Sequence, residues 1–318
     1  MQAPVQSRRG DLRRTLIAWF DSWAGAEELE ASAEPERVDW VRVLPFFALH
    51  LACFAVIWVG WSPVAVITAA ALYVVRMFAI TAFYHRYFSH RTFETSRAAQ
   101  FFFAALGASS AQRGPLWWAA HHRIHHRNSD QPGDPHSPKL RGFWWSHCLW
   151  FTARANFRTR REEVKDLMRF PELVFLDRFD IVAPAVLLGL LFLAGALCEA
   201  YAPGLGTTGW QMFVWGIVST IVLYHGTFTI NSLAHVFGRR RFETTDTSRN
   251  SVLLALITLG EGWHNNHHRY PGTARQGLRW WELDVSWYVL VVLSWFGIVR
   301  EMRTAPARAR GRTVEEPT

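Results

Sequence analysis

The sequence predicts an all-α integral membrane protein, and two observations carry this prediction. Half of the 318 residues are hydrophobic, with 17 Trp and 23 Phe among them. The hydrophobic residues gather in long stretches that are nearly free of charges, and most charged residues lie between those stretches. This separation is typical of membrane proteins, because a helix that crosses the hydrocarbon core must be apolar along most of its length.

Four stretches approach the roughly 20 residues that a helix needs to cross a bilayer. They are residues 41–60, 64–84, 181–201 and 211–233. Only Trp61, Ser62 and Pro63 separate the first two, and the short uncharged segment 202–210 separates the last two. We therefore expect four transmembrane helices arranged as two hairpins, within one membrane domain of residues 41–304.

The distribution of positive charge predicts the orientation in the membrane. The net charge is +8, and Lys and Arg are concentrated in the N-terminal segment 1–40, between the second and third stretches, and after residue 299. Both hairpin tips lack them. The positive-inside tendency therefore places both termini and the long central segment in the cytoplasm. The tail 305–318, rich in Arg, Pro and Thr, is expected to be disordered.

Composition also narrows the partners and the compartment. The basic residues flank apolar stretches and form no separate basic domain, so we expect a membrane-lipid partner and no nucleic acid. Cys53, Cys148 and Cys198 are scattered, which indicates neither a disulfide framework nor a cysteine metal site. The excess of Arg over Lys indicates a bacterial plasma membrane.

Three histidine clusters dominate the polar parts of the sequence. They are HRYFSH at 85–90, HRIHH at 122–126 and HNNHH at 264–268. In the second and third clusters the histidines stand at i, i+3 and i+4, which places three imidazoles on one face of a helix. In the first cluster the spacing is i, i+5, so both histidines reach one site only if the helix ends or bends between them.

A further histidine, His235, lies at the end of the fourth stretch, with Asn231 one turn before it. The full set of candidate ligands comprises His85, His90, His122, His125, His126, His235, His264, His267 and His268. Nine imidazoles are too many for one metal ion and about right for two. Imidazole binds Fe, Zn, Cu and Ni, but no HExxH motif supplies the Glu of a zinc peptidase. A pair of irons that binds O2 is the better match.

Residues near the clusters are expected to orient the ligands or to pack. Glu261 and Asp134 are candidates for carboxylates that hydrogen-bond ligand imidazoles and fix their tautomers. The alternative is that they cap a helix or lie in a solvated loop. Four isolated histidines are interpreted as packed or solvated residues, namely His50, His136, His147 and His225.

These residues closely resemble the membrane acyl-CoA delta-9 desaturase family, of the stearoyl-CoA desaturase type, from the first stretch to about residue 283. Beyond the clusters, the similarity rests on SHRT at 89–92, DPH at 134–136, RGF at 141–143, SH at 146–147, NSLAH at 231–235 and GEGWHN at 260–265. The resemblance implies four transmembrane helices below a helical cytoplasmic cap that holds two irons. It also implies that the nine histidines are ligands and that Asn231 reaches one iron through water.

The resemblance implies the reaction as well. Such enzymes use O2 and two electrons to introduce a double bond into a saturated long-chain acyl thioester (C16 or C18), here expected at delta-9. A kinked hydrophobic tunnel selects the methylene pair, because proximity and orientation decide which of many alike methylenes reacts. By similarity, the bend of the tunnel is lined by Gln112, Trp118, Thr227 and Phe228. Ordinary packing is the alternative role of these four residues.

The same similarity places Tyr73 and Met77 near the closed end of the tunnel. Met77 stands where the family often has a small residue, and a larger side chain there shortens the cavity. We therefore expect palmitoyl chains to be preferred over stearoyl chains. The alternative is that Met77 faces lipid.

The acyl carrier and the electron donor are less closely determined. Ala120 and His121 stand where mammalian members carry an Arg-Asp pair that contacts CoA, so an acyl lipid competes with acyl-CoA as the substrate. Arg113 could supply a phosphate contact instead. We find no heme-binding cytochrome b5 segment and no flavin motif, so electrons are expected from a separate ferredoxin, cytochrome b5 or flavin reductase at the basic face.

Two other functions remain as alternatives. A di-iron fatty acid hydroxylase or alkane monooxygenase would insert oxygen with similar chemistry, but such families generally space their histidines differently. A metal transport protein would place its ligands near the bilayer midplane, whereas these clusters lie outside the apolar stretches. Desaturation is therefore the first hypothesis.

Overall fold

The computed structural model describes residues 13, 15–24, 37–306 and 309. Most of the predicted tail 305–318 and much of the predicted segment 1–40 lie outside these residues. The α-helices within the described part are α3 (Leu44–Ala52), α4 (Val56–Val59), α5 (Pro63–Phe78), α6 (Arg97–Ala108), α7 (Pro115–Asn128), α8 (Pro138–Arg141), α9 (Lys165–Met168), α10 (Pro171–Arg178), α11 (Val182–Tyr201), α12 (Gly209–Asn231), α13 (Val252–Ile257), α14 (His264–Arg269) and α15 (Val285–Trp295). Strands β1 (Glu94–Thr95) and β2 (Val299–Arg300) form one short antiparallel pair.

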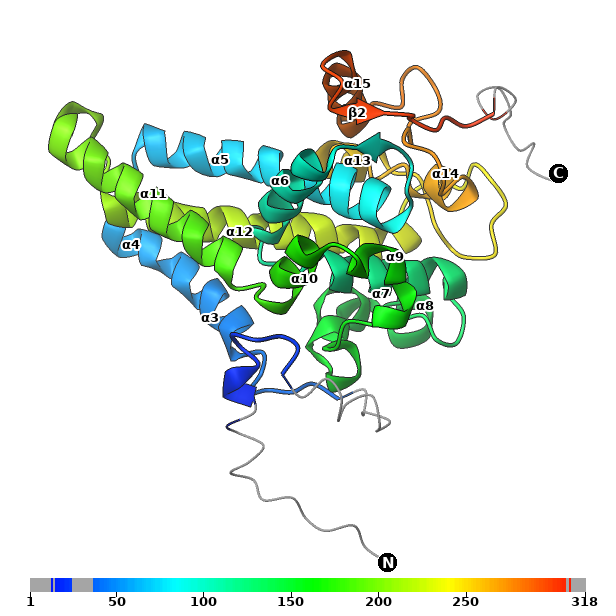
Figure 1. Ribbon diagram of the computed structural model, residues 1–318, viewed down its shortest axis with the longest axis horizontal. Coiled ribbons are helices and arrows are strands. Elements are labelled where there is room, and N and C mark those ends of the chain that lie inside the picture. Colours follow the sequence, from blue (N-terminus) through cyan, green and yellow to red (C-terminus); the bar gives the residue numbers. More distant parts are fainter. Residues whose placement is uncertain (1–12, 14, 25–36, 307–308, 310–318) are drawn as a thin grey trace, which may run out of the picture.

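The long helices form one part of the molecule and the short helices another. In Figure 1, α5, α11 and α12 run side by side, with α3 and α4 below them, and α7, α8, α9 and α14 gather around one end of α12. Helix α12 packs against both α5 and α11. The fold therefore presents a bundle of apolar helices whose ends meet a helical region that carries two of the histidine clusters.

Three helices are long and apolar enough to cross a membrane, and they match three of the four predicted spans. They cover Pro63–Ser89, Val182–Tyr201 and Gly209–His235. The first predicted span, 41–60, contains an apolar helix, Leu44–Val59, which is shorter than the other three. The fourth crossing therefore stays a prediction.

Local sequence explains where these helices begin. The Ser62 hydroxyl accepts a hydrogen bond from the backbone N–H of Ala65, and Pro63 fits the first helical turn of α5 because its missing N–H has no partner there. At α12, Thr208 and Gln211 form a reciprocal capping box. Each tight connection thus ends in a cap that satisfies the free N–H groups of the next helix.

The one charged side chain inside the second predicted span, Arg76, is buried and hydrogen-bonded. Arg76 on α5 donates hydrogen bonds to the Ser219 hydroxyl at 2.8 Å and the Thr220 hydroxyl at 2.7 Å, both on α12. A charged side chain among apolar helices is costly unless polar partners surround it. Arg76 therefore does not break the span but fastens α5 to α12.

Small residues allow α11 and α12 to approach closely. A Cβ added to Gly195 on α11 would collide with the backbone carbonyl of Thr208, and one added to Gly216 on α12 would collide with Leu191. Closely packed membrane helices commonly carry small residues where their backbones approach. Gly189, on the same helix as Gly195, has open space around it.

This contrast predicts the effect of two matched substitutions. Gly195→Ala should destabilise the protein by about 1–3 kcal/mol, because the backbone of residue 208 must move to admit the methyl group. Gly189→Ala should be neutral or slightly stabilising, because alanine favours a helix. Thermal unfolding of both variants in detergent measures the difference, and equal melting temperatures would contradict the close packing.

Candidate metal centre

The histidines of the first cluster lie on a continuation of α5. The helix continues past His85 as a π-helical segment, η2 (Ala79–Ser89), with His90 as the residue that ends it. Hydrogen bonds in a π-helix join residues five apart, so residues i and i+5 lie close together on one face. The structure thus meets the i, i+5 spacing by π-helical winding, which the sequence did not suggest, and the segment also ends at Ser89, between the two histidines, as the spacing suggested.

The nine predicted ligand histidines converge in two groups. His85, His90, His122, His126 and His267 form the first group, and His125, His235, His264 and His268 form the second. Helices α7 and α14 each send their i, i+4 pair to one group and the remaining histidine to the other. The turn η8 (Leu233–His235), which follows α12, supplies His235. The second and third clusters therefore each serve two adjacent sites, whereas both histidines of the first cluster serve one.

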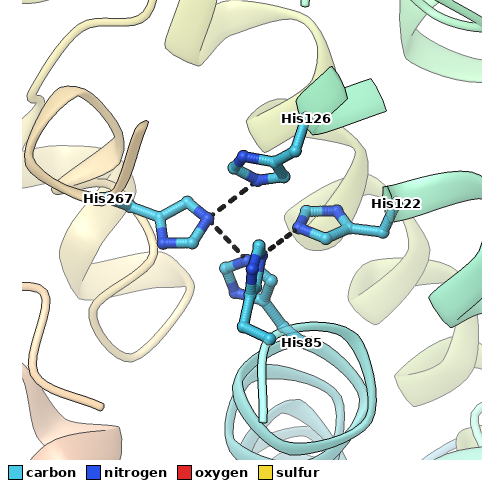
Figure 2. Close-up of side chains that lie close together, drawn as sticks. His85, His122, His126 and His267 are labelled. Atoms are coloured by element: carbon cyan, nitrogen blue, oxygen red, sulfur yellow. Dashed lines mark hydrogen bonds between the residues drawn. The ribbon is translucent and has the colours of Figure 1, made fainter. Parts of the chain in front are cut away.

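The imidazoles point their Nε2 atoms toward one another (Figure 2). In the first group, His267 Nε2 lies 3.0 Å from His85 Nε2 and 2.9 Å from His126 Nε2. In the second group, His264 Nε2 lies 3.1 Å from the Nε2 atoms of both His235 and His268. Within each group all ligand atoms lie within 4.8 Å of one another.

Carboxylates fix the tautomer of four of these imidazoles. A carboxylate accepts from an imidazole Nδ1–H in the pairs His85–Glu261 (2.5 Å), His125–Asp134 (2.9 Å), His235–Asp130 (3.2 Å) and His268–Asp246 (2.7 Å). When Nδ1 carries the proton, the Nε2 lone pair is free and points into the site. Glu261 and Asp134 lie where the sequence placed them, against ligand histidines.

Two of the four carboxylates escaped the sequence analysis. Asp130 follows the second cluster by four residues, and this proximity was a usable signal. Asp246 lies 18 residues before the third cluster, in a loop whose sequence gives no hint of its partner. The isolated His136, interpreted as a packed or solvated residue, is buried against the site, with its ring centroid 4.2 Å from that of His125.

Burial and the surrounding charges set the protonation states. Burial and the neighbouring imidazoles lower the pKa of His122, His126 and His264 well below its ordinary value. Burial opposes the charge of Glu261, but His85 and Arg86 outweigh this and lower the pKa of that carboxyl to about 2. At neutral pH these three imidazoles are therefore neutral, which metal binding requires, and the carboxylate is charged.

A buried ionic network holds the first group from behind. The Arg86 guanidinium donates to Glu261 at 3.0 Å and to Asp284 at 2.9 Å, and all three side chains are buried. Asp284 also accepts from the backbone N–H of Trp287, at the start of α15. Removing one member of such a network leaves an uncompensated buried charge. The orientation of His85 is thereby tied to the position of α15.

The donor set fits two transition-metal ions. His125 donates through Nδ1 to Asp134, and its Nε2, which points into the second group, has no hydrogen-bond partner in the described part of the chain. A buried lone pair without a donor is costly, and a cation is the partner that several converging lone pairs share. Imidazole-rich sites of this kind suit iron, copper or zinc.

The predicted tunnel residues line a cavity that reaches this site. Gln112, Trp118, Thr227 and Phe228 all line a cavity of about 230 Å³, together with His122 and Asn231. Gln112 Nε2 donates to the Thr227 hydroxyl at 3.1 Å across the cavity wall.

A second, smaller cavity of about 40 Å³ continues from the same residues. Trp118, His122 and Asn231 line both cavities, and Met77 lines the second. Met77 is fully buried, so the alternative that it faces lipid is wrong. Tyr73 lines neither cavity. Its hydroxyl donates to the Ile257 carbonyl at 2.7 Å.

Apolar helices of membrane-spanning length, joined to two buried imidazole groups, define a membrane-bound metalloenzyme. The chain belongs to the fatty acid desaturase family, which it matches over residues 59–290. It is 37% identical to an sn-1 stearoyl-lipid 9-desaturase of Anabaena variabilis, an alignment that covers 86% of this chain and 97% of that protein. It is 33% identical to an acyl-CoA C20 Delta5-desaturase of Anemone leveillei (91% and 95%) and 35% identical to Delta-9 acyl-lipid desaturase 1 of Arabidopsis thaliana (87% and 87%). The protein is an oxidoreductase that desaturates fatty acyl chains.

The carboxylates predict how the metal content responds to substitution. Asp246→Asn removes the charge that supports His268, so the second group should bind iron about 10–100-fold more weakly and retain about one ion per chain after dialysis against a chelator. Glu172→Gln, which alters a surface pair with the exposed Arg97, is the matched control and should retain two. Iron per protein, measured by mass spectrometry of the element, decides. Two ions in both variants would show that Asp246 does not support a ligand.

Proposed function

We propose that this protein introduces a delta-9 double bond into a saturated C16 or C18 acyl chain with O2, at a di-iron centre on the cytoplasmic side of a bacterial plasma membrane. The observation that carries the proposal is the meeting of two cavities at the imidazole groups. An acyl chain laid through both would pass His122 and Asn231 with carbons on either side. This is the arrangement that oxidation of an internal methylene pair requires.

The chain's own residues would bind and orient the substrate. With two irons held by the nine histidines, the centre would supply the oxidising chemistry. The two hydrogens removed from the acyl chain, O2, two electrons and two protons would together form two waters. Trp118, whose ring stacks on His122 at 5.0 Å, would press the acyl chain toward the site. The hydrogen bond between Gln112 and Thr227 would fix the bend of the chain beside it. Asn231, which lines both cavities, would hold a water on one iron.

The relatives support this reaction but differ in detail. Two of those compared carry 9-desaturase names and act on acyl lipids, while one is named as a Delta5-desaturase of acyl-CoA. The position of the double bond and the acyl carrier are therefore proposals for this chain. We also propose that a separate ferredoxin, cytochrome b5 or flavin reductase delivers the electrons at the basic cytoplasmic face.

Fatty-acid profiling of a desaturase-deficient host tests the reaction. Expression of the wild type should yield new delta-9 monoenes, located by derivatising the double bond before mass spectrometry. His125→Ala removes a ligand of the second group and should reduce the product at least a hundredfold. Glu172→Gln should match the wild type.

The products also separate the competing functions. Detection of hydroxylated fatty acids, heavier by one oxygen, would contradict desaturation and support the hydroxylase hypothesis. Monoenes at another position would move the double bond but leave the reaction class intact. Co-expression of a ferredoxin and its reductase guards against loss of activity through a missing donor.

Met77 predicts the preferred chain length. Because Met77 is fully buried and lines the inner cavity, Met77→Ala should lengthen the cavity and raise the ratio of C18 to C16 monoenes several-fold over that of the wild type. Val75→Ala is the matched control, because Val75 lies on the same helix but is 47% exposed. An unchanged ratio in Met77→Ala would show that the inner cavity does not determine the preferred length of the acyl chain.

A further inference from the structure

The larger cavity carries polar atoms that no described residue satisfies. Four of its lining side chains have a buried nitrogen without a hydrogen-bond partner in the described part of the chain, namely Trp19 Nε1, Arg42 Nη2, His121 Nε2 and Trp150 Nε1. His121 is 2% exposed and Trp150 is 6% exposed. Buried polar groups are normally paired, because an unpaired one is destabilising. These atoms are therefore placed for the polar part of a ligand.

A series of side-chain contacts follows the cavity wall away from the imidazole groups. Trp150 lies against His136, with ring centroids 5.0 Å apart, and stacks on Trp117 at 5.4 Å. The guanidinium of Arg113 lies 5.5 Å from the Trp117 ring. Arg113 in turn donates to the Ser22 hydroxyl at 3.1 Å. The unpartnered nitrogens thus lie along the cavity wall, between the imidazole groups and the segment that contains Trp19 and Ser22.

The four atoms offer both donors and an acceptor. His121 Nδ1 lies 3.0 Å from the Trp117 carbonyl and must donate to it, because that oxygen can only accept. His121 Nε2 therefore presents a lone pair, whereas the two indoles and the guanidinium present N–H groups. This set matches a ligand with ester oxygens and at least one hydroxyl.

The outer part of the cavity is formed where two apolar helices begin. Val43, Pro45 and Phe46 at the start of α3 line it, and so do Ile181 and Pro184 at the start of α11. The neighbouring exposed side chains are apolar, namely Leu16, Ile17, Phe20, Leu44 and Val182. Exposed apolar rims of this kind lie in a membrane interface. A ligand would therefore enter from the bilayer and not from water.

The charges along the wall suit a head group with little charge. Arg42 and Arg113 are the cations among the described lining residues. Arg113 is already engaged by Asp180 at 3.3 Å and by the Phe157 carbonyl at 2.7 Å. CoA carries several phosphate charges, and phosphates are typically held by several Arg or Lys side chains. One guanidinium with an unpartnered N–H suits a neutral or singly charged carrier instead.

We propose that this cavity binds the glycerol-ester end of a membrane acyl lipid, with Trp150 and Arg42 donating to ester oxygens and His121 accepting from a head-group hydroxyl. The assignment rests on the proposed desaturase function and makes an acyl lipid, not acyl-CoA, the substrate. Trp150 and His121 then become specificity-determining residues.

Equilibrium binding tests the assignment without relying on turnover. The full-length, iron-loaded protein in detergent is titrated with radiolabelled 1-stearoyl-2-oleoyl-phosphatidylglycerol, and stearoyl-CoA is added as competitor. The lipid should bind, and an equal concentration of stearoyl-CoA should not displace it. Trp150→Phe, which keeps the ring but removes the N–H, should raise Kd about tenfold. Trp144→Phe, at a position 68% exposed, should leave Kd unchanged.

Several results would overturn the proposal. One is displacement of the lipid by stearoyl-CoA. Another is an equal Kd for the wild type and Trp150→Phe, provided that the variant retains the wild-type iron content, which shows that it is folded. His121→Phe is a second variant, because it removes the acceptor and should also weaken binding. Lipid binding that depends on Trp150 in a protein that yields no monoenes would support the lipid site and refute the desaturation. Monoene production by a protein that does not bind the lipid would support the desaturation and refute the lipid site.

Discussion

The convergence of nine imidazole lone pairs in a buried space is the constraint on which this structure depends. Imidazoles 2.9 to 3.1 Å apart cannot all hydrogen-bond one another, because each nitrogen that carries no proton needs a donor or a cation. The four carboxylates add to this constraint, because each accepts a hydrogen bond from the Nδ1–H of one imidazole and so leaves its Nε2 without a proton. They thereby leave inner nitrogens that could bind a metal ion. The segments η2, α7, η8 and α14 are arranged so that their imidazole nitrogens converge in the two groups.

The two groups differ in what supports them. Three carboxylates, Asp130, Asp134 and Asp246, stand behind the second group of four histidines. One carboxylate, Glu261, stands behind the first group of five, and Arg86 offsets its charge. A more negative surrounding favours the more highly charged state of a bound ion. The surroundings of the two candidate metal sites are therefore inequivalent.

The spacing of the histidines predicted a set of nine candidate ligands, and the structure brings these nine side chains together in two groups. Residue type and period are local properties, so the sequence could indicate the candidates but not their arrangement. It could not assign His125 and His126 to different groups, since both lie on one helical face and only the packing of α7 against α14 separates them. The π-helical winding of η2 was equally hidden, because nothing in the letters between His85 and His90 distinguishes it from a helix end. Three spans were predicted to within a few residues at their starts, but the short helix Leu44–Val59 leaves the first crossing undecided.

One continuous helix connects the membrane part to the chemistry. Arg76 fastens it to α12, Met77 and Ile80 line the inner cavity, and His85 reaches the first imidazole group. All these residues lie on α5 and its continuation η2, so the distance from the inner cavity to the ligands is fixed by a rigid element and not by a loop. A rigid spacing is what selection among chemically equal methylenes demands, because a shift of one carbon changes the product. Under the proposed function, the same winding that brings His85 and His90 to one site would therefore also set where on the acyl chain that site acts.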